Sequence, residues 1–167
     1  MSSLPEQPEI SSAEYRRVLG HFLTGVTIIT AIDPDSSEPV GLAASSFTSV
    51  SMDPPLVLFC AGKTSASWTR IQVAKRFCIN VLGDANETIS RTFATKGADK
   101  FAGLGWTPGP SGSPVLGDAL AWIDCQVHEE VEAGDHVVVI GRVLGLGAKD
   151  SGGPLGYYRG GYGRFTV

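Results

Sequence analysis

Apolar residues near the N-terminus recur with the spacing of a helix face. The positions i, i+3, i+4 and i+7, typical of one side of an α-helix, are filled by Tyr15, Val18, Leu19 and Phe22. Ser11 precedes this run and Glu14 follows it by three positions, which is a capping-box pattern. The sequence therefore predicts a short helix that begins after Ser11 and ends near residues 24–25.

Most of the remaining chain consists of short apolar runs separated by turn residues. The runs expected to form strands are 26–32, 40–51, 56–61, 77–82, 120–131 and 136–144. The alternation in 120–131 places Ile123, Cys125 and Val127 on one face. Two further short helices are predicted, at 67–75 and from a cap at Asp84 to about Phe93. Because the strands do not alternate regularly with helices, an antiparallel, closed or partly closed barrel is favoured over a parallel sheet.

Glycine is abundant, with 21 of 167 residues against an average of about 7%. No repeat accounts for these glycines, so they are expected to serve turns and close backbone approaches. Many lie with prolines in 96–117, a predicted long loop of the kind that is often functional. Within it, Asp99 and Lys100 are expected to be a solvated pair or the flank of a lid. We expect one domain over 1–167, with 1–12 as a mobile tail.

Charge and composition exclude several classes of partner. The net charge is −4, without the basic patch expected of a nucleic-acid-binding protein. No apolar run approaches the roughly 20 residues of a membrane span, so no membrane partner is expected. The N-terminal residues lack the basic and apolar regions of a signal peptide, and we expect a cytoplasmic protein. The thiols of Cys60, Cys78 and Cys125 lie in strand-like runs without metal-site spacing and are expected to be buried.

Common catalytic motifs are absent. The glycines in 103–108 lack the third glycine of a dinucleotide fingerprint and do not follow a strand. There is no Walker A sequence and no nucleophile elbow. His21, His128 and His136 are not clustered with acidic residues at metal-ligand spacing, so no metal site is expected. Hydrolase and metalloenzyme functions are therefore disfavoured.

The stretch 41–51 is rich in small side chains, which would allow the backbone to lie flat against a planar ligand. Its candidate donors to a phosphate or ribityl chain are the hydroxyls of Ser46, Thr48, Ser49 and Ser51. A lysine and more hydroxyls follow the next predicted strand, at Lys63, Thr64, Ser65 and Ser67. On composition alone, an ordinary polar edge strand followed by a turn is the favoured interpretation.

Seven stretches in order along almost the whole chain carry a resemblance. They are 18–30, 41–60, 76–82, 99–106, 112–127, 134–143 and 154–162. Together they resemble the short-chain flavin reductases, which supply two-component hydroxylases acting on phenols, 4-hydroxyphenylacetate and steroid-derived phenols. KTSASW at 63–68, DKFAGLGW at 99–106 and YYRG at 157–160 resemble the steroid-ring branch most. The resemblance implies a mainly β protein with short helices, folded as an FMN-binding split β-barrel of antiparallel, Greek-key strands.

The resemblance also assigns site residues. For flavin it implies Ala43, Ala44, Ser45, Ser46, Phe47, Ser49, Val50, Lys63, Thr64, Ser65, Ser67, Trp68 and Phe93. For the nicotinamide dinucleotide it implies His136, Tyr157, Tyr158, Arg159 and Gly160. Several family members have an asparagine where this chain has Ser45, although serine still offers a donor and an acceptor. From the residues alone, a turn-capping or half-buried side chain is the favoured interpretation of His136. For Arg159, a solvated residue and a partner of a dinucleotide phosphate are equally open.

The implied reaction is hydride transfer from NADH or NADPH to FMN or FAD, delivering reduced flavin to a separate monooxygenase. The cofactors carry this chemistry, which agrees with the absence of an acid–base pair. The resemblance further implies a homodimer with flavin near the subunit interface. Two alternatives stay open: a non-catalytic flavin-binding electron carrier, and a split-barrel oxidase of a pyridoxine phosphate. The oxidase would need a basic phosphate cluster, for which only Lys63 is a candidate.

Overall fold

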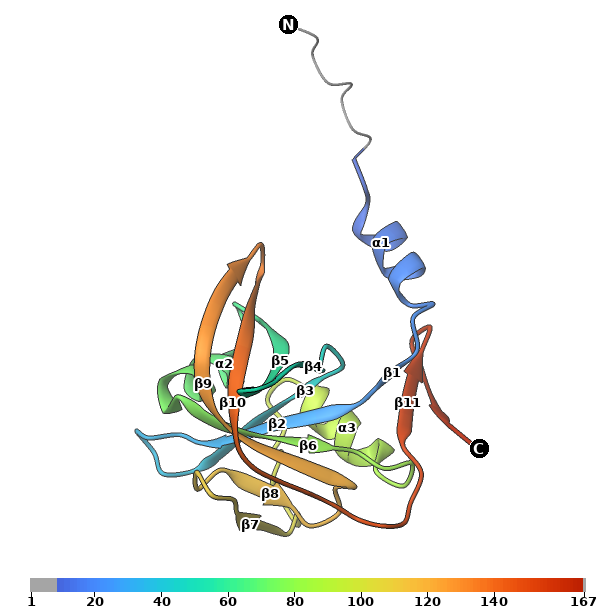
Figure 1. Ribbon diagram of the computed structural model, residues 1–167. Coiled ribbons are helices and arrows are strands. Elements are labelled where there is room, and N and C mark those ends of the chain that lie inside the picture. Colours follow the sequence, from blue (N-terminus) through green and yellow to red (C-terminus); the bar gives the residue numbers. More distant parts are fainter. Residues whose placement is uncertain (1–8, 167) are drawn as a thin grey trace, which may run out of the picture.

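A computed structural model describes residues 9–166 (Figure 1). The part of the expected tail at 1–8 lies outside the described residues. The helices are α1 (Ser12–Leu19), α2 (Ala66–Ala74) and α3 (Glu87–Ala94). The strands are β1 (Thr24–Gly25), β2 (Thr27–Ile32), β3 (Pro39–Ala44), β4 (Thr48–Met52), β5 (Pro55–Gly62), β6 (Arg76–Val81), β7 (Trp106–Pro108), β8 (Pro114–Leu116), β9 (Ala121–Ala133), β10 (His136–Ala148), β11 (Leu155–Tyr158) and β12 (Gly161–Arg164). The prediction of a mainly β fold with short helices is confirmed.

The main sheet has seven antiparallel strands in the order β3-β2-β6-β9-β10-β5-β4. The β9–β10 hairpin lies between β5 and β6, which are consecutive strands, and such crossed neighbours are typical of Greek-key barrels. The two edge strands, β3 and β4, are also consecutive, and only residues 45–47 connect them. Because this connection is so short, the sheet must curl until its two edges approach each other (Figure 1).

The seam between these edges has no ladder in the described part of the chain, and the Ser46 side chain in the connection bonds to β5. No strand pairing joins β3 to β4 within residues 9–166. The Ser46 hydroxyl accepts a hydrogen bond from the Cys60 backbone N–H at 2.8 Å and lies 3.3 Å from the Cys60 carbonyl, to which it donates. Ser46 thereby prolongs the contact of β4 with β5 beyond the Thr48–Leu58 pair, and its hydroxyl is engaged by backbone.

Two apolar clusters lie on opposite faces of β2, as the alternation of side chains along a strand requires. Ile29 belongs to the cluster inside the curled sheet, where the rings of Phe59 and Trp68 meet edge to face at 5.9 Å between centroids. Ile28 belongs to the cluster beneath α3, which includes Phe93. One strand therefore contributes to both clusters, and α2 and α3 pack against the same sheet.

Several local predictions need correction. The stretch 96–117, predicted as a loop, contains the short strands β7 and β8, which pair with each other, and the Leu116 backbone N–H of β8 also donates to the buried Asn80 Oδ1 at 2.8 Å. The cap of α3 is Asn86, not Asp84. The Asn86 side chain accepts a hydrogen bond from the Gly83 N–H at 2.8 Å, so it stabilises the turn that precedes the helix.

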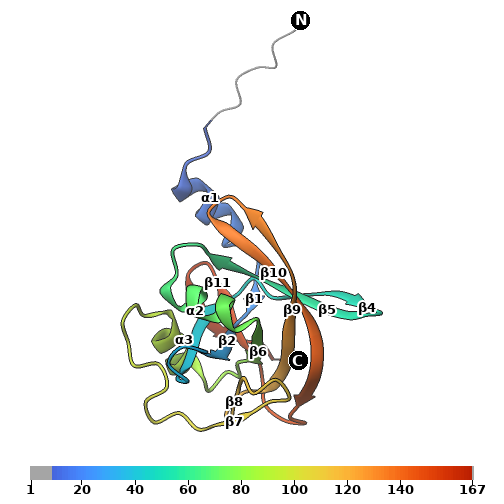
Figure 2. The ribbon, with the colours of Figure 1, turned by 90° about the vertical axis from the view of Figure 1, so that its left-hand side faces the viewer.

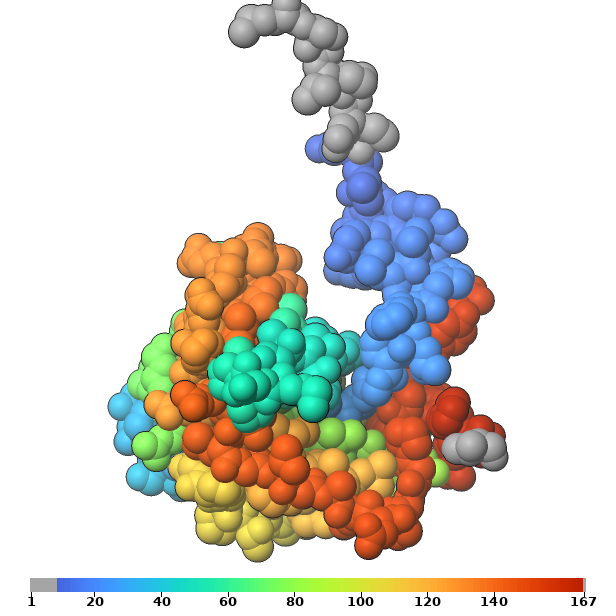
Figure 3. All heavy atoms as spheres, in the orientation of Figure 1, coloured from blue at the N-terminus to red at the C-terminus, as the bar shows by residue number. Residues whose placement is uncertain are grey.

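Helix α1 extends away from the rest of the fold (Figures 1 and 3). It begins where predicted, with the Ser11 hydroxyl accepting from the Glu14 backbone N–H at 3.2 Å, but it ends at Leu19 and not near residues 24–25. None of its residues is buried, and its apolar face continues to Phe22, which is 75% exposed. Within residues 9–166, none of the helices is both long and apolar enough to cross a lipid bilayer.

Candidate functional site

A cleft of about 800 Å³ lies between β3, the start of α2 and the segment that follows α3. Both helices contact β3 and lie near each other in Figure 2, but they pack on opposite faces of the sheet, α2 in the cluster of Ile29 and α3 in that of Ile28. The residues predicted to bind flavin that line this cleft are Ala43, Thr64, Ser65, Ser67 and Phe93. Three regions distant in sequence therefore contribute to one hollow, of a size typical of small-molecule sites.

The floor of the cleft depends on a close approach between Gly41 and Phe93. A Cβ atom added to Gly41 would lie 2.6 Å from Phe93 Cε1 and 3.0 Å from the Ile29 carbonyl oxygen. Phe93 is only 2% exposed and meets the ring of Phe101 edge to face, at 5.1 Å between centroids. Glycine at this position lets the Phe93 ring lie directly on β3, which fixes α3 against the strand.

The N-terminus of α2 opens onto the cleft. Ser65 is its N-cap, and the Ser65 hydroxyl accepts from the Trp68 backbone N–H at 3.2 Å. Thr64 and Ser67 line the cleft on either side of this cap. Free N–H groups and the positive end of the helix dipole favour an anion at this end of a helix.

Lys100 reaches into the cleft, contrary to the expectation of a solvated pair with Asp99. The Lys100 ammonium donates to the Gly41 carbonyl at 3.0 Å and to Ser67 Oγ at 3.1 Å. Partial burial lowers the pKa of Lys100 below its ordinary value. The sequence carried no signal for this position, because the contacts join three segments that only the fold brings together.

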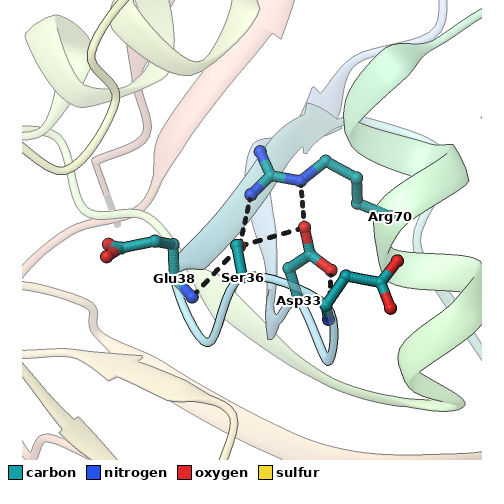
Figure 4. A network of polar contacts seen from close by, with 5 residues as sticks. Asp33, Ser36, Glu38 and Arg70 are labelled. Atoms are coloured by element: carbon teal, nitrogen blue, oxygen red, sulfur yellow. Dashed lines mark hydrogen bonds and ion pairs between the residues drawn. The ribbon is translucent and has the colours of Figure 1, made fainter.

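A polar network holds the outer wall of the cleft (Figure 4). Arg70 Nε of α2 lies 2.6 Å from Asp33 Oδ2 in the turn before β3, and the Arg70 guanidinium also donates to Ser36 Oγ at 3.3 Å. Asp33 further accepts from the Asp35 backbone N–H at 3.0 Å. The network joins α2 to the β2–β3 turn and thereby fixes the position of β3 relative to the helix.

This network should make stability depend on acid pH. The hydrogen bond from Arg70 holds the pKa of the Asp33 carboxyl below its usual range. A depressed carboxyl pKa adds stability above the unfolded value of about 4, and that stability is lost as pH falls through the folded value. The free energy of unfolding, measured with urea, should therefore fall less between neutral and acid pH for Arg70→Leu than for the wild type. Arg76→Leu, at an exposed position on β6, is the control, and equal losses in all three proteins would refute the coupling.

The other predicted flavin residues lie outside the cleft lining. Ala44 ends β3, Ser45 to Phe47 form the seam connection, and Ser49 and Val50 lie exposed on β4. Lys63 follows β5, with its Nζ 3.4 Å from Glu132 Oε2. Trp68 is 2% exposed and belongs to the core beneath α2. Apart from Trp68, these residues continue from the cleft along the split of the barrel.

His136 lies at the tip of the β9–β10 hairpin, opposite Gly62 in the register. Its side chain is 49% exposed, and its Nδ1 lies 2.7 Å from Asp135 Oδ1. This contact lowers the pKa of the Asp135 carboxyl. Because the Asp135 carboxylate contacts Nδ1 of His136, the other ring nitrogen, Nε2, can bond another group.

The remaining predicted nicotinamide residues lie together at the β11–β12 hairpin. Tyr157 and Tyr158 are on β11, and Arg159 and Gly160 form the turn, with φ of 49° and 80°. Tyr158 also lines a second hollow, of about 630 Å³, between β1, β11 and β12. In Figure 1 this hairpin lies apart from the tip of the β9–β10 hairpin, which carries His136.

Proteins of known sequence are similar to this chain along most of its length. A flavin reductase from Pseudomonas putida is 47% identical over 153 residues, which cover 92% of this chain and 89% of that protein. The reductase subunit HsaB of a flavin-dependent monooxygenase from Rhodococcus jostii is also 47% identical over 153 residues, covering 92% of this chain and 77% of that protein.

Solved structures agree in fold. Nitrilotriacetate monooxygenase component B from Mycobacterium thermoresistibile has a TM-score of 0.88 and 46% identity, covering 92% of this chain and 86% of that one. The NADH:FAD oxidoreductase SgcE6 of Streptomyces globisporus, solved with NAD and FAD fragments, has a TM-score of 0.86 and 37% identity over 92% of both chains. The flavin reductase like domain matches residues 19–166. The chain belongs to the flavin reductase like family.

Proposed function

We propose that the protein is an NAD(P)H-dependent flavin reductase that supplies reduced FMN or FAD to a separate monooxygenase. The observation that carries this proposal is the cleft beside β3, formed in a chain of this family by small residues, the start of α2 and Lys100. When bound, flavin would accept a hydride from reduced nicotinamide, and the protein would supply orientation and electrostatics. Relatives named as reductase subunits or components of monooxygenases support the separate oxygenase partner.

The position of β3 and β4 suits a planar heteroaromatic ligand. Each is an edge strand, so its outer side presents backbone N–H and C=O groups that a ring can bond, apart from the Gly41 carbonyl, which accepts from Lys100. Ala43, Ala44 and Ser45 offer little side-chain bulk there. We place the flavin ring along this split, among the predicted residues from Ala43 to Val50, and the phosphate toward α2.

We assign the nicotinamide dinucleotide to His136 and the β11–β12 hairpin, with each group supplied by a different subunit. Two flat rings must meet face to face for hydride transfer, and holding them in that geometry lowers the barrier by proximity. Because one chain separates the two groups, a second copy of the chain is needed to bring them together.

The same proposal requires a homodimer, and helix α1 supports it. A helix that projects from the fold with an exposed apolar face is unfavourable in water, and a second chain would cover that face. Sedimentation should therefore give two chains per particle, and the double variant Val18→Glu/Phe22→Glu should sediment as a monomer. Arg16→Glu, on the same helix, is the control. A monomeric wild type would contradict the dimer and the shared site.

We also propose a single domain in the cytoplasm, where reduced nicotinamide cofactors are kept. The single-domain proposal is supported by β2, which contributes to both apolar clusters and so joins them in one unit.

Steady-state oxidation of NADH and NADPH with FMN, FAD or no added flavin tests the activity. Flavin-dependent loss of nicotinamide absorbance is the expected result, and the faster pairs identify the preferred cofactors. A protein that binds flavin but oxidises neither nicotinamide would instead be the non-catalytic flavin carrier.

A further inference from the structure

Partial burial of the Lys100 ammonium costs desolvation free energy, and its present contacts do not offset that cost. Its ammonium is partly withdrawn from water yet bonds only a neutral carbonyl and a neutral hydroxyl. No carboxylate within residues 9–166 forms an ion pair with it. A latch between β3 and α2 would need donors but no charge, and burying an unpaired charge is unfavourable. The charge therefore points to an anionic ligand.

Lys100 and Ser67 can each donate one more hydrogen bond. An ammonium group has three donors, and Lys100 uses two of them. The Ser67 hydroxyl accepts from Lys100, so its own proton is free to be donated. Two donors, one of them charged, thus remain beside the first turn of α2.

The other charged groups of the cleft are differently engaged. Arg70 is bound to Asp33, and Lys96 is exposed on the rim. Glu38 and Asp99 also line the cleft, and both are exposed residues. Lys100 is the cation that lies between the strand and the helix, at the inner wall.

We propose that Lys100, together with Ser67, binds the phosphate of the flavin nucleotide and makes the protein prefer phosphorylated flavins over riboflavin. This inference rests on the proposed function and names a residue for the substrate's anionic group. The two existing hydrogen bonds of Lys100 hold the ammonium in place, so the phosphate can be bound without breaking the link between β3 and α2.

Fluorescence titration of the full-length protein with FMN and with riboflavin tests the assignment. Lys100→Met keeps the apolar stem and removes the charge, and it should weaken FMN binding by about tenfold or more while changing riboflavin binding by less than about twofold. Lys100→Arg should recover part of the FMN affinity. Lys149→Met removes another lysine that donates to a carbonyl, at 2.9 Å from Gly117 O, and should change neither affinity.

Three results would overturn the proposal. Equal weakening of both flavins in Lys100→Met would mean that Lys100 only holds the cleft together. Unchanged FMN affinity would mean that the phosphate binds elsewhere. A wild type that binds neither flavin would refute this proposal and the proposed function together. Oxidation of NADH by the wild type with riboflavin would support the proposed function independently of the role of Lys100.

Discussion

Gly41→Ala is expected to lower the free energy of unfolding by roughly 1–3 kcal/mol, the range for overpacking a well-packed interior. The new methyl group would lie 2.6 Å from a carbon of the Phe93 ring and 3.0 Å from the Ile29 carbonyl oxygen. The Ile29 oxygen cannot retreat easily, because β2 is paired on both sides, with β3 and β6. The Phe93 ring must therefore move, and it lines the floor of the cleft. Flavin affinity should fall together with stability.

Chemical denaturation of three variants checks this packing argument. Gly25→Ala adds the same methyl group where nothing lies within 4 Å, and it should change the unfolding free energy little. A Phe93→Leu background removes the nearest ring atoms, so Gly41→Ala should be less destabilising there than in the wild type. Equal effects of Gly41→Ala in both backgrounds would show that Phe93 is not the residue displaced.

His136→Ala is expected to raise the KM for NADH by roughly 10- to 100-fold, the range for losing a hydrogen bond to a charged group. Flavin affinity should stay within about twofold, because His136 lies at a hairpin tip outside the cleft. The Asp135 contact at 2.7 Å fixes the ring, so the free nitrogen is held in position for the dinucleotide.

The control for His136 lies on the partner strand of the same hairpin. His128 is exposed on β9, and His128→Ala should leave the KM for NADH unchanged. If His136→Ala also leaves KM and kcat unchanged, His136 does not belong to the nicotinamide site. If it instead weakens flavin binding, the residue contacts flavin and the assignment of the two cofactors must be exchanged.

Local patterns predicted most of the secondary structure. The β-branched run at 26–32 forms β2, and the Ser11 cap starts α1 as expected. The alternation in 120–131 failed to predict one feature: Asp124 is fully buried beside Cys125. Its carboxylate accepts hydrogen bonds from the Ser111 backbone and hydroxyl, so it stabilises the turn between β7 and β8. Periodicity cannot reveal such a partner, because it is distant in sequence.

The candidate site likewise combines features that local sequence predicts with features that only the fold creates. The small residues of β3 and the hydroxyls at the start of α2 follow from local sequence, and the fold places several of them along one cleft. Lys100 could not be predicted, because its contacts with Gly41 and Ser67 span 59 and 33 positions of sequence. The separation of His136 from the β11–β12 hairpin was equally hidden, since it depends on the direction in which each hairpin extends.

Anaerobic mixing of the protein with one equivalent each of NADH and FMN tests the central claim most directly. A flavin reductase should bleach the oxidised flavin absorbance as NADH is consumed, one for one, and admitting oxygen should restore it. Repeating the experiment without protein sets the background rate. Bleaching no faster than that background with FMN or FAD, and with NADH or NADPH, would contradict the account.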